Sequence, residues 1–137
     1  MISFKKANRE LYAEYSQELE NLYIEGFTKG ASAQNINRDN AQAYLENLFQ
    51  DAYGIFGFSN SNLIAALIAA TPGSDNERPE NIRNSFNDDD TEYIAEVIVS
   101  EKFRRLGIAK KMFEEYENQL DSSINKILLR VWDKNIA

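Results

Sequence analysis

The sequence predicts a single domain of the α/β class, more narrowly of the α+β type. Three observations carry this prediction. A mostly apolar, β-branched stretch at residues 93–99 is followed by a glycine-bearing turn and an amphipathic helix. Two helical patterns precede a pair of apolar runs separated by a polar turn. The chain has 137 residues and is 43% hydrophobic, so one core over residues 1–137 is expected.

The N-terminal residues predict a short strand and a helix. Ile2 and Phe4 alternate with polar residues, as in a strand with one buried face. Asn8 is a suitable N-cap, because its side chain can accept from a free N–H of the first helical turn. Apolar residues then recur at helical spacing from Leu11 to about Glu25, which predicts the first helix.

A second helix and a strand hairpin are expected next. The helix begins near Asn37 or Arg38. Its apolar stripe, which we interpret as core, consists of Ala41, Tyr44, Leu45, Leu48 and Phe49. Residues 52–58 and 63–71 predict two strands joined by the polar turn 59–62. The pattern of the second strand also fits a helix, but the turn residues on both sides of it favour a strand.

The stretch that follows the apolar run at residues 93–99 has the features of an anion site. Gly107 lets a phosphate approach the backbone, and Arg104 and Arg105 place positive charge beside it. The free N–H groups of a helix start attract anions, so this turn suits a pyrophosphate. A turn glycine with two solvated arginines is the alternative interpretation. The helix that follows has the apolar positions Ile108, Met112, Phe113, Tyr116 and Leu120.

The amino-acid composition limits the kinds of catalysis and binding that the protein can support. The chain has no cysteine and no histidine, which excludes disulfides, thiol catalysis and the commonest metal ligand. We therefore expect no metal and a cytoplasmic location. The net charge of −7 argues against nucleic-acid binding and suits a cationic substrate such as an amine. No apolar run is long enough to span a membrane. Residues 72–91 predict a solvated loop, whose acidic residues would attract an amine if the loop lay beside the acceptor cleft.

The strand, turn and helix also carry a recognisable pattern. Val97-Ile98-Val99 ends the strand, residues 100–103 form a short polar link, and Arg104-Arg105-Leu106-Gly107-Ile108-Ala109 opens the helix. This segment resembles the GNAT superfamily of acyl-CoA-dependent N-acyltransferases, with Glu101 where the family often has proline. The resemblance is specific over residues 92–137. It implies a mixed, mainly antiparallel sheet flanked by helices, in the order β-α-α-β-β-β-α-β.

The resemblance implies acetyl-CoA (coenzyme A) as co-substrate. In the family the pantetheine arm makes strand-like hydrogen bonds to backbone at the positions of Val97 and Val99. The pyrophosphate sits on the turn from Arg105 to Lys110, and Asn135 matches an asparagine that contacts the arm. The expected cofactor-binding residues are Val97, Ile98, Val99, Arg104, Arg105, Leu106, Gly107, Ile108, Ala109, Lys110 and Asn135.

The expected catalytic residues are Glu96 and Tyr93. Family members often place an acid or histidine two or four residues before the apolar-x-Val pair, positions that hold Ala95 and Tyr93 here. Strand alternation points Glu96 to the opposite face, and a β-bulge, which the family tends to have in this strand, would turn it inward. Tyr93, Glu92 and a water chain compete with Glu96 as proton acceptor.

The C-terminal residues depart from the family pattern. Residues 124–132 predict a buried strand. The family continues past this point with a tyrosine-bearing helix and two strands, so the chain is expected to be a C-terminally short GNAT domain. An uncovered apolar edge strand invites pairing with a second chain, which predicts a homodimer through this strand.

Two functions follow from the resemblance. The first is an N-acetyltransferase in which a primary amine, of a small molecule or a protein, attacks the thioester of acetyl-CoA directly. The alternative is a non-catalytic acyl-CoA-binding or interaction module derived from a truncated GNAT domain. No membrane partner is expected.

Overall fold

Five strands form one sheet in the computed structural model, which describes residues 2–28, 37–70, 91–120, 124 and 126–129. In the spatial order of the sheet the strands are β1 (Ile2–Ala7), β2 (Tyr53–Ser59), β3 (Asn62–Ala70), β4 (Thr91–Val99) and β5 (Lys126–Leu129). Each of the first four strands is antiparallel to its neighbours among them, and β5 pairs in parallel with β4.

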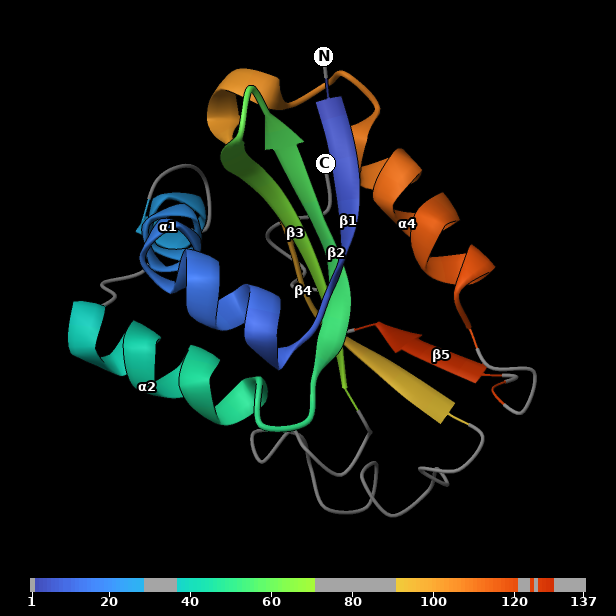
Figure 1. Ribbon diagram of the computed structural model, residues 1–137, viewed down its shortest axis with the longest axis horizontal. Helices are drawn as coiled ribbons and strands as arrows, with labels where there is room; N and C mark the ends of the chain where they lie inside the picture. Colours follow the sequence, from blue (N-terminus) through green and yellow to red (C-terminus); the bar gives the residue numbers. More distant parts are fainter. Residues whose placement is uncertain (1, 29–36, 71–90, 121–123, 125, 130–137) are drawn as a thin grey trace.

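Helices cover both faces of the sheet (Figure 1). The helices α1 (Arg9–Thr28) and α2 (Arg38–Leu48) pack together on one face, and α4 (Ile108–Asn118) lies on the other. A single turn of 3₁₀ helix, η2 (Glu101–Phe103), links β4 to α4. Apart from η2, the described elements follow the predicted order along the chain.

The N-cap predicted at Asn8 is confirmed, and the structure adds a second cap at Asn37, where the second helix was expected to begin. The Oδ1 atom of Asn8 accepts from the Leu11 N–H at 2.9 Å, and Oδ1 of Asn37 accepts from the Asp39 N–H at 2.7 Å. Each bond satisfies an N–H group that has no acceptor within its helix. The first helix extends to Thr28, three residues beyond the predicted end near Glu25.

The hairpin turn is tighter than predicted. Ser59 and Asn62, which were predicted to belong to the turn, pair with each other at the ends of β2 and β3. The turn consists of Asn60 and Ser61, whose φ angles are 51° and 71°. Left-handed conformations at both central residues match the twist of the flanking strands, and asparagine tolerates this conformation better than most residues. Residues 63–70 form a strand, as predicted.

Strand β3 is the middle strand of the sheet and is buried on both faces. Ala66 and Ile68 pack in the core under α1 and α2. Ala65, Leu67 and Ala69 pack in the second core under α4. Small side chains on a central strand let the helices approach the sheet closely, which explains the unusual alternation of alanine with branched residues.

A β-bulge interrupts the pairing of β3 with β4. Ile68 pairs with Glu96 and Ala69 pairs with Ile94, so Ala95 is an extra residue in β4. A bulge residue changes which side chains share a face of the sheet. The bulge that the family resemblance implied is thus confirmed.

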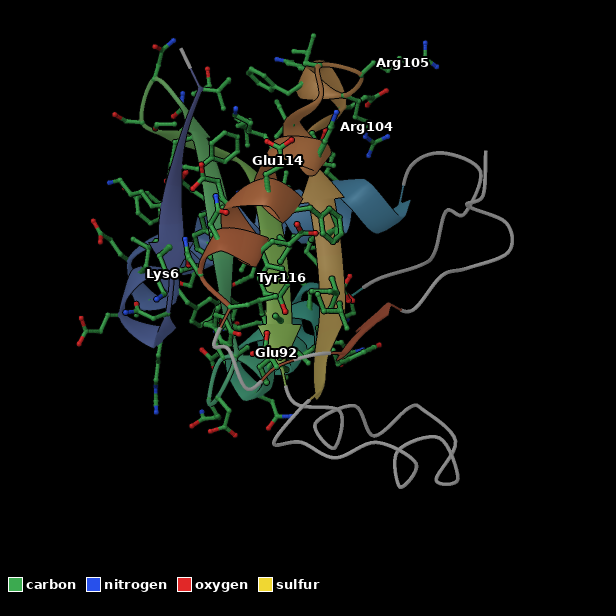
Figure 2. All side chains as sticks on the ribbon, turned by 90° about the vertical axis from the view of Figure 1, so that its right-hand side faces the viewer. Lys6, Glu92, Arg104, Arg105, Glu114 and Tyr116 are labelled. Atoms are coloured by element: carbon green, nitrogen blue, oxygen red, sulfur yellow. The ribbon has the colours of Figure 1, made fainter. Side chains whose placement is uncertain are left out.

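A buried carboxyl group ties α4 to the start of β4. Glu92 is only 9% exposed, and the hydroxyls of Tyr53 and Tyr116 both donate to its carboxylate. Tyr116 comes from the last turns of α4 and Tyr53 from the start of β2. Figure 2 shows the side chains of Glu92 and Tyr116 directed toward each other. This cluster holds three elements together at the end of the sheet away from Arg104 and Arg105.

Tyr116→Phe is expected to lower the free energy of unfolding by about 1–3 kcal/mol, because it leaves a buried carboxylate oxygen with one donor fewer. Urea denaturation of both proteins measures the difference. Tyr15→Phe removes the same hydroxyl from a half-buried ring on the opposite face of the sheet and should cost less. Equal stability of Tyr116→Phe and wild type would mean that the bond contributes nothing.

The remaining expectations fall partly outside the described residues. Of the predicted strand at residues 124–132, the structure describes Ile124 and residues 126–129. The predicted loop at 72–91, apart from Thr91, and Asn135 lie outside them. No helix among the described residues is long and apolar enough to cross a membrane.

Candidate functional site

The C-terminal half of β4 presents backbone groups on the side away from β3. The N–H of Ser100 donates to the Ile64 carbonyl at 2.8 Å, so Ser100 faces β3. Backbone direction alternates along an antiparallel ladder, so Val97 and Val99 direct their N–H and C=O groups toward the β5 side. The pairing of β5 described in the structure reaches β4 only from Thr91 to Ile94. The backbone of Val97 and Val99 is therefore placed to bind an extended ligand.

The link between β4 and α4 brings two arginines to this edge. Nε of Arg104 donates to the Val99 carbonyl oxygen at 3.1 Å, which holds the side chain against the end of the strand. Arg105 has a φ of 65°. A left-handed conformation is uncommon outside glycine and points to a functional constraint. Figure 2 shows both arginines at the end of the molecule where α4 begins.

The start of α4 has the backbone geometry of an anion site. Gly107 is its N-cap, with a φ of 76° and no capping side chain. The first bond of the helix runs from the Lys111 N–H to the Gly107 carbonyl at 3.1 Å. The N–H groups of Ile108, Ala109 and Lys110 therefore have no acceptor within the helix. A Cβ atom built on Gly107 would meet nothing within 4 Å, so the space above the turn is open.

A carboxylate and several tyrosines gather on the other face of β4. The Tyr44 hydroxyl, from α2, donates to Oε1 of Glu96 at 2.9 Å. The Tyr23 ring, from α1, lies 5.6 Å from the Tyr44 ring, centroid to centroid. Tyr93 is 3% exposed and close enough to Tyr44 to influence its ionisation. Burial, and then the Glu96 carboxylate, raise the pKa of Tyr44 far above its usual value, so its hydroxyl stays a donor.

The bulge corrects the face that alternation assigned to Glu96. Strict alternation would separate Glu96 from Tyr93. Because Ala95 is an extra residue, Glu96 and Tyr93 both lie on the face covered by α1 and α2. Glu92, considered as a competing base, lies on the α4 face and is held by Tyr53 and Tyr116. The structure thus separates Glu92 from Glu96.

Sequence reasoning interpreted Tyr44 only as a core residue. Its ring does lie in the apolar stripe of α2, packed against the core under α1 and α2. The available signal was the hydroxyl, since a tyrosine on the inward face of a helix needs a polar partner. The other predicted residues lie where β4 ends and α4 begins. Leu106 is 66% exposed, whereas Ile108, the first residue of α4, is buried in the core between α4 and the sheet.

The free energy of unfolding is expected to fall above pH 10. The folded-state pKa of Tyr44 is raised, so its contribution to stability is complete below the unfolded value of about 10 and is lost as pH rises above it. The decrease is at most about 1.4 kcal/mol per pH unit for this one group. Urea denaturation of wild type and Tyr44→Phe at pH 9, 10 and 11 tests this. Parallel pH profiles for the two proteins would contradict it.

Among the described residues, no group of acidic side chains is arranged to hold a metal ion. The described residues give two candidate parts of a functional site. One part is the edge of β4 with the turn at residues 104–110, and the other is Glu96 with its tyrosines.

Solved structures of several acetyltransferases share this fold. A ribosomal-protein-alanine N-acetyltransferase from Brucella melitensis biovar Abortus 2308 shares 17% identity, with a TM-score of 0.60 over 97% of this chain and 82% of that one. The aminoglycoside antibiotic 6′-N-acetyltransferase from Acinetobacter haemolyticus shares 14% identity, with a TM-score of 0.67 over 98% and 82%. A predicted acetyltransferase with acetyl-CoA from Clostridium acetobutylicum shares 20% identity, with a TM-score of 0.61 over 97% and 82%.

At these identities the structural matches establish the fold alone. No curated protein matches the chain by sequence at a significant level. The model of the Acetyltransferase (GNAT) family matches residues 10–137, which is most of the sequence. The chain therefore belongs to the GNAT acetyltransferase family.

Proposed function

We propose that the protein transfers an acetyl group from acetyl-CoA to a primary amine. One observation carries the proposal. The backbone of Val97 and Val99, which faces away from β3, leads directly into the open turn at residues 104–110. Glu96 lies between the bulge residue and Val97, and its side chain points to the face of the sheet that α1 and α2 cover. A donor bound along the edge would thus reach an acceptor held beside Glu96.

The edge and the turn are assigned to acetyl-CoA. The pyrophosphate would bind the free N–H groups at the start of α4, where the helix dipole adds partial positive charge. Arg104 and Arg105 would add formal charge, and the open space above Gly107 would admit the phosphates. The pantetheine amides would pair with Val97 and Val99 as an added strand does. The side chains of Ile108 and Ala109 would support the turn from beneath.

Glu96 is assigned as general base. The acceptor amine is protonated at neutral pH and must lose a proton before it attacks the thioester carbonyl. Glu96 takes that proton, a C–N bond forms, the C–S bond breaks, and coenzyme A leaves as the thiolate. Tyr44 fixes the carboxylate by its hydrogen bond, and the Val97 N–H is placed to stabilise charge on the carbonyl oxygen. Tyr93 contributes to the wall of the acceptor site.

Two measurements in sequence test this function. Calorimetric titration with acetyl-CoA tests the donor site, and saturable binding is expected. Release of coenzyme A is then followed with a thiol reagent across a panel of primary amines. Because the chain contains no cysteine, the reagent reports only the released coenzyme A. Amine-dependent release supports the proposal, and absence of binding overturns it.

Binding without release for any amine would instead favour the non-catalytic acyl-CoA-binding module. The homodimer through residues 124–132 stays a prediction, and Ile127 in this segment is 42% exposed. Sedimentation of the protein at high concentration tests it, and a clean monomer would contradict it.

A further inference from the structure

A groove of about 380 Å³ lies between α1 and α2. It is lined by side chains of α1, of the last turn of α2 and of the residues just after α2, among them Arg9, Tyr12, Ser16, Glu46, Phe49 and Gln50. Tyr12 and Tyr23 are eleven positions apart on α1, so the groove is roughly 16 Å along the helix from the tyrosines beside Glu96. Its volume falls in the range of small-molecule sites. The groove is thus separate from the site assigned to acyl transfer.

A buried hydroxyl in the wall of this groove has no partner. Tyr12 is 6% exposed, and its ring stacks on Phe49 with centroids 4.5 Å apart and planes 6° apart. Its hydroxyl makes no hydrogen bond within the described part of the chain. Burial, and then the carboxylates of Glu46 and Glu20, raise the pKa of Tyr12 to about 12, so the hydroxyl is protonated at neutral pH. A buried donor without an acceptor is unfavourable, and a bound acceptor would relieve it.

The groove also holds two opposite charges that do not neutralise each other. Arg9, at the start of α1, and Glu46, in the last turn of α2, are both exposed and line the same groove. They form no ion pair with each other, whereas Arg38 pairs with Glu20 elsewhere between the same helices at 3.7 Å. A ligand with one cationic and one anionic group would therefore meet a complementary charge at each end.

The backbone is irregular at this place. Tyr15, between Tyr12 and Ser16, has a φ of −116° and a ψ of 20°, which kinks α1. Kinks normally occur at proline or glycine, and residues 9–18 contain neither. An irregular turn maintained beside an unsatisfied hydroxyl is consistent with a binding site.

We propose that this groove binds a small zwitterion of the α-amino acid class. The ligand carboxylate accepts from the Tyr12 hydroxyl and the Arg9 guanidinium, and the ligand ammonium donates to Glu46. Tyr12, Ala13 and Phe49 supply the apolar part of the groove lining, against which a hydrophobic side chain of the ligand would pack. This site does not depend on acyl transfer by the protein.

The test is calorimetric titration of the full chain with L-leucine, N-acetyl-L-leucine and L-leucine methyl ester. L-Leucine is expected to bind with a millimolar Kd. N-acetyl-L-leucine lacks the cation and the ester lacks the anion, so both should bind at least tenfold more weakly. The ester is still a primary amine, so a ligand of the acyl-acceptor site would not show this loss.

Variants separate the groove from the other site. Arg9→Gln and Glu46→Gln should weaken L-leucine binding at least tenfold, and Tyr12→Phe at least fivefold. Tyr12→Phe removes an unpartnered hydroxyl, so the free variant should unfold at a temperature equal to or above that of wild type. Glu10→Gln, exposed on α1 and outside the groove lining, and Glu96→Gln should bind within twofold of wild type.

Three results would overturn the proposal. The first is no saturable binding of L-leucine. The second is equal binding of L-leucine, its ester and its N-acetyl derivative. The third is unchanged affinity in Arg9→Gln, Glu46→Gln and Tyr12→Phe.

Discussion

Glu96→Gln is expected to lower kcat by about 10²–10⁴-fold while the Kd for acetyl-CoA stays within about twofold. The glutamine has the shape of glutamate, and its amide oxygen can still accept the hydrogen bond from Tyr44. What it lacks is the capacity to take a proton from the acceptor amine. The substitution therefore tests the chemical role of Glu96 and leaves its packing intact.

The measurement is the initial rate of coenzyme A release with the best amine of the panel, together with calorimetry for acetyl-CoA. Two matched variants serve as controls. Tyr93→Phe keeps the wall of the acceptor site and should change kcat by less than tenfold. Glu114→Gln changes an exposed carboxylate on α4 and should leave kcat unchanged. If Glu96→Gln retains a third or more of the wild-type kcat, the base is another group.

Gly107→Trp is expected to raise the Kd for acetyl-CoA at least about 100-fold, a loss of about 2.7 kcal/mol of binding free energy. An indole at this position would occupy the open space above the turn, where a Cβ atom meets no protein atom within 4 Å. The same openness means that the new Cβ atom has nothing to clash with in the free protein. The cost to folding is the left-handed conformation at φ 76°, about 1–2 kcal/mol for a residue other than glycine.

A second substitution at the same position distinguishes the effect of backbone strain at residue 107 from the effect of a side chain that blocks acetyl-CoA. Asparagine tolerates the left-handed conformation and has a much shorter side chain, so Gly107→Asn should raise the Kd by about tenfold or less. Thermal unfolding of both variants checks that they fold. Wild-type affinity in a folded Gly107→Trp protein would show that acetyl-CoA does not approach this turn.

The sequence was most informative where one local pattern specified both structure and chemistry. At Gly107, the change from strand to helix periodicity requires a turn, and the glycine and arginines predict an anion site within it. The helix cap at Asn8 was equally predictable, since capping depends on a side chain and a backbone group only a few residues apart. These contacts join residues that are close together in the sequence.

The features of the site that the sequence did not predict depend on contacts between residues far apart in the chain. Tyr44 and Glu96 are 52 positions apart, and their hydrogen bond exists only because the fold brings α2 to the same face of the sheet as Glu96. The face that Glu96 occupies depends on the register of β4 against β3, which the sequence of β4 alone does not encode. The tight turn at Asn60 and Ser61 was placed one residue too wide at each end, because a polar residue fits a strand end as well as a turn.

The extra residue at Ala95 also bears on how related chains are compared. A one-residue slip in a regular strand turns every later side chain to the opposite face. Here the pairs on either side of Ala95 are already in register, so a chain without it would keep Tyr93 and Glu96 on the face they occupy now. Loss of this residue is therefore neutral for the site. Relatives aligned at fixed spacing from Gly107 will match Glu96 correctly, but they will match Tyr93 to the wrong residue whenever their strands differ by this one position.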